Sequence, residues 1–341
     1  MKKKNRIAIV LVIVLCSISF WFTVNNKKNT INKSLRDFAV SDTTAITKIV
    51  LSNKTDSLVL ERKPSSKWKV NSKYNVELRA ITRLLYTINK IEPSEPVAKN
   101  IQKEIDQQLI QEGLKCEVYQ NNTLVKAYLV GKATPDQSGT YMALLNLKTM
   151  QLAERSFIVY IPGIDGNLSP NYAVDEKMWR EKNVFDVAAN EIKSVKVEVP
   201  FNPDYGYEVA VKTGGEYQLK LADGKIFKQI DTATIKQYFS YFKQLGFEKF
   251  EANYSKPEID SIKATKPLNI VTVTTLSGNI TKVNFYARKP MVAGLKDATG
   301  KTILFDQDRM NALINDHNEL VVVKYYVFGK IMPPVDYFFK K

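Results

Sequence analysis

The sequence predicts an α+β fold: an N-terminal transmembrane helix followed by two tandem, similar modules, each a mostly antiparallel sheet with a packed helix. Three observations carry this prediction. An uncharged apolar run stands near the N-terminus, alternating apolar runs open each half of the remaining chain, and an amphipathic helical pattern follows those runs both times. At 341 residues, the chain is long enough for two domains that each bury a core.

The apolar run covers residues 7–24 and follows a basic end, residues 1–6. As a helix the run would reach about 27 Å, close to the hydrocarbon thickness of a bilayer. The basic flank places the N-terminus in the cytoplasm, so the chain from the polar stalk at residues 25–36 onward is expected to be periplasmic or otherwise extracytoplasmic. The predicted location is therefore the inner (cytoplasmic) membrane, with a single pass.

Two alternatives to an anchor remain open at this end. A cleaved signal peptide would need small residues near its end, where the sequence has Trp21 and Phe22. Lipidation at Cys16 would need a small residue just before the cysteine, and Leu15 occupies that place. We therefore expect the segment to be retained as an anchor.

The first module, residues 37–177, opens with strand-like runs at 46–52, 57–62 and 68–70. Apolar residues then recur at three- and four-residue spacing and predict a helix with one buried stripe: Leu78, Ile81, Leu84, Leu85, Ile88 and Ile91. Pro93 and Pro96 end that helix. A second helix is expected over 101–112, and the remaining strands at 116–119, 124–130, 141–145 and 156–161.

The second module, residues 178–341, repeats these parts in order. Strands are expected at 192–199, 207–212 and 217–221, and Asp231 is suited to cap a helix with an apolar face of Ile235, Tyr238, Phe239, Phe242 and Leu245. Further strands are expected at 270–276, 280–286 and 320–328, with a short helix at 307–314. The two helices keep a constant offset of 154 residues, from Ile81 to Ile235 and from Leu85 to Phe239, which indicates duplication.

The formal net charge is +15. Attraction to nucleic acid or anionic lipid is one interpretation, but the lysines are scattered and no nucleic-acid fold motif is present, so a solvated basic surface is favoured and no nucleic-acid partner is expected. Beyond the anchor Cys116 is the only cysteine, which excludes an intramolecular disulfide in the exported part.

No catalytic, cofactor-binding or metal-binding residues are predicted. His317 is the only histidine and has no partner motif, and a zinc site from Cys116 and His317 lacks further ligands at suitable spacing. The run from Asp165 to Asn167 lacks the acidic residues that complete a calcium loop. Phosphate-binding glycine loops and nucleophile elbows are absent from the sequence, although an enzyme with an unrecognised site remains an alternative.

Two stretches are candidate binding surfaces. The aromatic tail ends in Tyr337, Phe338 and Phe339, which either dock onto a partner or pack back across their own module. Arg288 and Lys289 stand in a loop that either approaches an anion or lipid headgroup or is simply solvated.

Several segments resemble the bacterial domain-of-unknown-function family numbered 4340. They are the apolar N-terminus, SSKWKV around Trp68, LRAITRLLYTI, EGLKCEVY, KAYLVGKATPDQSGTYM and MWREKNVFDV, and the resemblance covers most of residues 46–335. The family implies a membrane-associated, exported protein of uncharacterised role, in some genomes encoded beside components of gliding-motility-like ABC transporters. It implies no catalytic residues.

The expected function is therefore that of a membrane-anchored, non-enzymatic envelope protein, an accessory or scaffolding component of a membrane assembly such as an ABC-type transport or motility system. Its expected partners are the membrane, through residues 7–24, and a protein of an inner-membrane complex. A binding module for envelope glycan or lipid is the alternative from a different class.

Overall fold

The computed structural model describes residue 17 and residues 33–63, 66–164, 166–227, 229–252, 254–290, 292, 294–315 and 319–339. The expected anchor, residues 7–24, lies outside the described residues apart from Ser17. Among the residues that are described, none of the helices combines the length and the apolar character that a bilayer crossing requires. The chain divides into two compact units, the first ending at Glu181 and the second beginning at Lys182, a few residues after the boundary expected at Met178.

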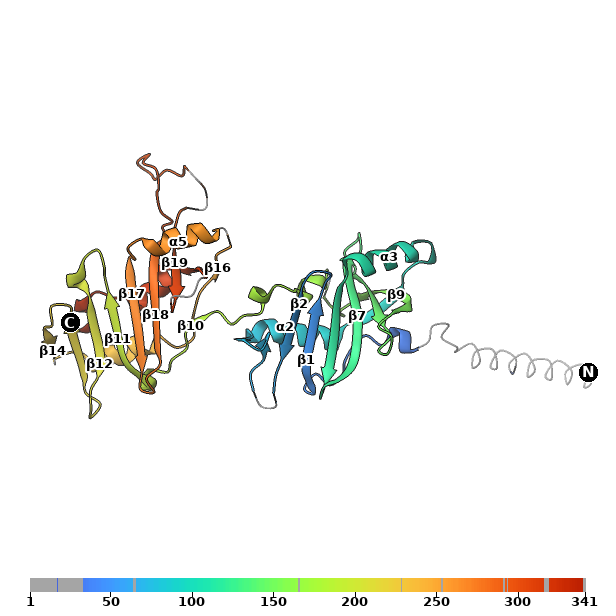
Figure 1. The fold of residues 1–341 in the computed structure, drawn as a ribbon, viewed down its shortest axis with the longest axis horizontal. Helices are drawn as coiled ribbons and strands as arrows, with labels where there is room; N and C mark the ends of the chain where they lie inside the picture. The colour runs from blue at the N-terminus through green and yellow to red at the C-terminus, as the bar shows by residue number, and fades with distance from the viewer. Residues whose placement is uncertain are drawn as a thin grey trace, which may run out of the picture. The chain divides into compact units, whose positions relative to one another are not determined.

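In the described part of the first unit, the strands form a nine-stranded antiparallel sheet with the order β4-β3-β2-β1-β6-β7-β8-β9-β5 (Figure 1). The elements are β1 (Ile46–Ser52), β2 (Ser57–Glu61), β3 (Lys69–Val70), β4 (Tyr74–Asn75), α2 (Leu78–Lys90), β5 (Glu92–Pro96), α3 (Lys99–Glu112), β6 (Leu114–Gln120), β7 (Thr123–Ala133), β8 (Thr140–Leu145) and β9 (Leu152–Tyr160). Short 3-10 turns flank the sheet: η1 (Lys33–Arg36), η2 (Ser169–Tyr172) and η3 (Glu176–Met178).

The second unit repeats this order strand for strand, as β14-β13-β12-β11-β17-β18-β19-β20-β16 within its described residues. Its strands are β11 (Ile192–Glu198), β12 (Tyr207–Val211), β13 (Tyr217–Leu221), β14 (Ile226–Phe227), β16 (Lys249–Phe250), β17 (Asn269–Thr275), β18 (Ile280–Ala287), β19 (Arg309–Ile314) and β20 (Val321–Lys324). A small separate pair joins β10 (Asn183–Phe185) to β15 (Leu245–Gly246). The helices and 3-10 turns are α4 (Thr232–Ser240), α5 (Lys256–Ala264), α6 (Tyr325–Phe328), η4 (Ala189–Glu191), η5 (Pro203–Tyr205), η6 (Gly329–Ile331) and η7 (Val335–Phe338).

The match between the units extends to an irregularity. The β1–β6 ladder shifts register between Ile46 and Lys48, and the β11–β17 ladder shifts between Ile192 and Ser194. These are corresponding positions in the two central strands, so both sheets carry a bulge at the same place. The structure thus confirms the predicted α+β class and the two mostly antiparallel sheets.

Each sheet is covered on both faces rather than on one. In the first unit the α2 stripe, including Ile81, Leu84 and Ile88, packs with Tyr128 and Met142 in the main core. Side chains at the alternate positions of the same strands face the opposite side of the sheet. On that side α3 covers only the half of the sheet from β7 to β9. The second unit has α4 on its main core and α5 against the opposite face. The sequence predicted α2, α3 and α4 but not α5.

Two predicted elements of the second unit are wrong. Residues 309–314 form the strand β19 instead of part of a short helix, because β19 lies between β18 and β20 and is buried on both faces. A short strand buried on both faces loses the alternation of apolar and polar residues that distinguishes a strand from a helix. The last strand, β20, stops at Lys324, and the chain turns into α6 instead of continuing to Phe328.

The edge strands of both sheets are short or rich in proline. β4, β14 and β16 have two residues each, and β5 has the sequence EPSEP, with prolines at positions 93 and 96. Proline lacks the N–H that would pair with a further strand, so β5 is a poor partner for one, and the two-residue edges offer little backbone for pairing.

Candidate functional site

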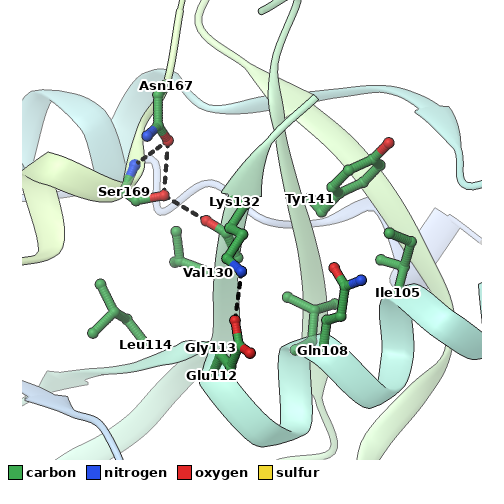
Figure 2. A pocket seen from close by; sticks show the side chains of 12 residues that line it. Ile105, Gln108, Glu112, Gly113, Leu114, Val130, Lys132, Tyr141, Asn167 and Ser169 are labelled. Carbon is green, nitrogen blue, oxygen red and sulfur yellow. Dashed lines mark hydrogen bonds and ion pairs between the residues drawn. The ribbon is translucent and has the colours of Figure 1, made fainter. Parts of the chain in front are cut away.

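A pocket opens in the first unit beside the C-terminal half of α3, between that helix, β7 and the segment at residues 167–169 (Figure 2). We call it the α3 pocket. Its volume is about 240 Å³. Its apolar wall includes Ile105, Leu109, Leu114 and Val130, and its polar rim includes Gln108, Tyr141, Asn167 and Ser169.

Two glycines allow the backbone to approach closely around this pocket. A Cβ on Gly131 would lie 2.8 Å from Leu109 Cδ2 and 3.0 Å from the Tyr141 carbonyl oxygen, so only glycine lets α3 pack this near to β7. A Cβ on Gly113 would lie 2.3 Å from the Leu109 carbonyl oxygen, at the point where α3 ends and β6 begins. The sequence pattern did not indicate this pocket, because the predicted strand ended at residue 130 and left Gly131 outside it, whereas β7 continues to Ala133.

The polar rim is ordered by hydrogen bonds among its own residues. The Ser169 hydroxyl lies within hydrogen-bonding distance of the Gly131 carbonyl oxygen and 2.7 Å from Asn167 Oδ1. The Ser169 backbone N–H also donates to Asn167 Oδ1, over 2.9 Å (Figure 2). At the mouth, Lys132 and Glu112 form an exposed ion pair of 2.6 Å, and the hydrogen bond from Lys132 lowers the pKa of Glu112. An apolar wall with a few fixed polar groups suits a small ligand with hydroxyl or amide groups.

The described residues that hydrogen-bond the Ser169 hydroxyl are Gly131 and Asn167. Ser169 has no adjacent general base among them, and the single histidine, His317, lies outside the described residues, as does Asp165 of the calcium-like run. Among the described residues, there is no group of three or more His, Cys, Asp or Glu side chains that could hold a metal ion. Burial raises the pKa of the Cys116 thiol to about 12, and the side chain is fully enclosed.

Arg288 is not a surface residue, although it was a candidate for anion binding. Its Nη2 lies 2.9 Å from Glu251 Oε2 and its Nη1 lies 3.3 Å from Asp306 Oδ2, with 4% of the Arg288 side chain and 1% of the Glu251 side chain exposed. The two carboxylates already use the guanidinium, and Asp306 also donates its backbone N–H to the Arg288 carbonyl, over 2.8 Å. This arrangement ties the long loop after β18 back to its sheet. Lys289 is exposed beside it.

The aromatic tail packs across its own unit. The Phe338 ring is fully buried and lies 5.3 Å from the Tyr207 ring and 5.1 Å from the Tyr238 ring, measured between centroids. Phe339 lies 5.1 Å from Phe227, and burial is the main cause that raises the pKa of Tyr337 to about 12. Of the two interpretations of the tail, this arrangement agrees with packing onto the module.

The fold places the chain in the class of α+β proteins with two similar units: the described parts of both units have the same nine-strand order. The first unit also has a small pocket beside α3. The chain belongs to the family described as a domain of unknown function (DUF4340), whose family model matches residues 68–267. The match runs from just before β3 to just before β17, so it extends over parts of both units. No curated protein and no solved structure matches the chain.

Proposed function

We propose that this chain is a membrane-anchored, non-enzymatic envelope protein that serves as an accessory or scaffolding component of a membrane assembly, such as an ABC-type transport or motility system. The observation that carries the proposal is the repeated sheet: the two units share one strand order, and such a repeat suits a spacer or support built from two like domains. The apolar, uncharged run at residues 7–24 supports the anchored part of the proposal.

Charged side chains that pair with one another within the second unit support a structural role. In the second unit, Arg288, Glu251 and Asp306 satisfy one another, and Arg309 pairs with Glu248 over 2.9 Å. Groups paired in this way are poorly placed to act as free acids or bases.

The test is affinity purification of the full chain from membranes of its native host, compared with a variant that lacks residues 1–24. We expect the full chain to resist carbonate extraction and to bring down a membrane protein in constant ratio, and the shortened variant to lose both properties. Mass spectrometry identifies the associated proteins. Recovery of the full chain alone, with envelope glycan retained, would instead support the second candidate function.

That second candidate is a binding module for envelope glycan, and the α3 pocket favours it. Its hydroxyl and amide rim offers hydrogen bonds to a sugar, and its apolar wall offers a surface for a ring face. Ser169→Ala should weaken binding of soluble envelope glycan fragments several-fold in calorimetry, since one hydrogen bond is worth about 1 kcal/mol. Ser57→Ala, at an exposed position on β2, is the matched control and should leave binding unchanged.

A further inference from the structure

A second hollow in the first unit is strongly basic. It has a volume of about 700 Å³ and lies over β1, β2 and β3. Among the described residues that line it, five side chains are cationic and one is a carboxylate, Glu61. We call it the basic hollow, and its cations are Lys48, Arg62, Lys63, Lys67 and Lys69.

The fold holds two of these cations in place without neutralising them. Arg62 donates from Nε to the Ile46 carbonyl, over 3.0 Å, and from Nη2 to the Thr44 carbonyl, over 2.6 Å, while its guanidinium lies 4.9 Å from the centre of the Trp68 ring. Lys48 Nζ lies 4.0 Å over the Tyr119 ring. Carbonyl oxygens and aromatic faces orient a cation but carry no full negative charge, so both side chains remain positive towards the hollow.

Among the described lining residues one carboxylate, Glu61, offsets part of this charge, and it stands between Lys48 and Lys69 in the sheet. Glu61 accepts a hydrogen bond from the Ser72 hydroxyl, and Lys67 lies 3.8 Å from Glu181 with most of its side chain exposed. Within the part of the chain that the structure describes, Lys48, Lys63 and Lys69 have no carboxylate at ion-pair distance. The hollow therefore keeps an excess of positive charge that an anion could neutralise.

The second unit shows that the fold itself does not require this charge. Across three neighbouring strands of the first sheet, Lys48 pairs with Glu61, and Glu61 pairs with Lys69. At the corresponding rungs of the second sheet, just after the matching bulge, the row is Ser194, Ala210 and Gln218. At these rungs the first sheet is charged and the second is neutral, whereas two residues further along the second sheet carries its own Lys–Glu–Lys row, Lys196, Glu208 and Lys220.

We propose that the basic hollow binds a ligand that carries two neighbouring phosphate groups, with Lys48 and Lys69 donating to the phosphate oxygens and Arg62 facing them. Phosphate carries more than one negative charge and accepts several hydrogen bonds, which suits several cations gathered around one hollow. Such a ligand has two sources: a soluble diphosphate compound, or the headgroup of a lipid with two phosphates. The site is separate from the α3 pocket and does not depend on the proposed scaffolding role.

The experiment uses the full chain in phosphatidylcholine nanodiscs and follows the acetylation rate of individual lysines by mass spectrometry. One arm adds inorganic pyrophosphate, and the other replaces part of the lipid with cardiolipin. We expect slower acetylation of Lys48 and Lys69 in one arm: protection by pyrophosphate indicates a soluble ligand, and protection in cardiolipin discs alone indicates a lipid headgroup. Unchanged rates in both arms, or equal protection by sodium chloride of the same ionic strength, would overturn the proposal.

A pair of matched variants separates a defined site from diffuse charge. Lys48→Ser combined with Lys69→Gln installs the residues of the second unit and should weaken binding at least about tenfold, as expected for two lost cation contacts to phosphate. Lys193→Ser combined with Lys220→Gln removes the same charge from exposed positions of the second sheet and should leave affinity within about twofold. Equal weakening by both variants would overturn the proposal. If a variant fails to fold, the acetylation rates of the unmodified chain decide whether the proposal holds.

Discussion

At the scale of single residues, burial decides the chemistry of the ionisable groups. Arg288 is a candidate for anion binding in the sequence and Cys116 is the only cysteine beyond the expected anchor, and the structure encloses both. Two carboxylates lie against the Arg288 guanidinium, whereas burial raises the pKa of the Cys116 thiol and so favours its neutral form.

Cys116 should be inert in the folded protein. At pH 8 iodoacetamide should alkylate it far more slowly in the native chain than in guanidinium, because the thiolate is the reactive form and burial raises the thiol pKa to about 12. Peptide-level mass spectrometry separates this signal from that of Cys16. Because the unfolded thiol ionises at its ordinary pKa of 9.0, this group should also make the protein less stable as pH rises from there towards 12. Equal alkylation rates in both states would contradict the enclosed position.

Arg288→Met should destabilise the chain by about 3–5 kcal/mol, because it leaves the buried Glu251 carboxylate without its partner. Urea unfolding followed by circular dichroism measures the change. The neighbouring Lys289→Met, at an exposed position, is the control and should change stability by less than about 0.5 kcal/mol. A similar, small effect of both substitutions would show that the ion pairs contribute little.

At the scale of elements, the fully buried side chain of Phe338 is the centre of the tail's packing. The η7 turn inserts Phe338 between Tyr207 and Tyr238, and the Phe338 carbonyl accepts the backbone N–H of Asp231, which caps α4. The tail thereby joins the last turn of the chain to the start of the helix that covers the second core.

Phe338→Ala should cost about 3–5 kcal/mol of stability, as expected when a large buried ring leaves a cavity. The exposed Tyr326→Ala is a suitable control, with little expected effect. Urea unfolding measures the change in the free energy of unfolding for both variants. A tail that functions instead by docking to a partner would give the opposite pattern, with stability unchanged and partner binding lost.

The elements also show what the sequence could predict. The stripe of Ile81, Leu84 and Ile88 identified α2 because one face is buried and the other is exposed. For β19 the same reasoning failed because neighbouring layers cover both of its faces. Neither hollow was predicted, since each gathers residues that only the folded chain brings together: a side-chain hydrogen bond joins Ser169 to Gly131, and ladder pairing places Lys48 and Lys69 on either side of Glu61.

At the scale of the whole molecule, the chain consists of two units that each have their own main core. The second unit has the same topology as the first. The shared bulge shows that the two units agree even in a local irregularity of the sheet. The anchor and the envelope location remain predictions at this scale, and the carbonate extraction described above tests them.

Separate cores should give two unfolding transitions in scanning calorimetry. Phe157→Ala in the first unit and Phe285→Ala in the second each remove a fully buried ring, so each should lower one transition and leave the other in place. A single transition that shifts equally in both variants would mean that the units unfold together.

The short and proline-containing edge strands affect how the protein associates at high protein concentration. A sheet whose last strand is open and apolar can add the edge of another molecule and continue into a fibril. Here β4, β14 and β16 offer two residues each, and β5 lacks a backbone N–H at positions 93 and 96. Crowded copies can therefore lie side by side without their sheets fusing into a polymer.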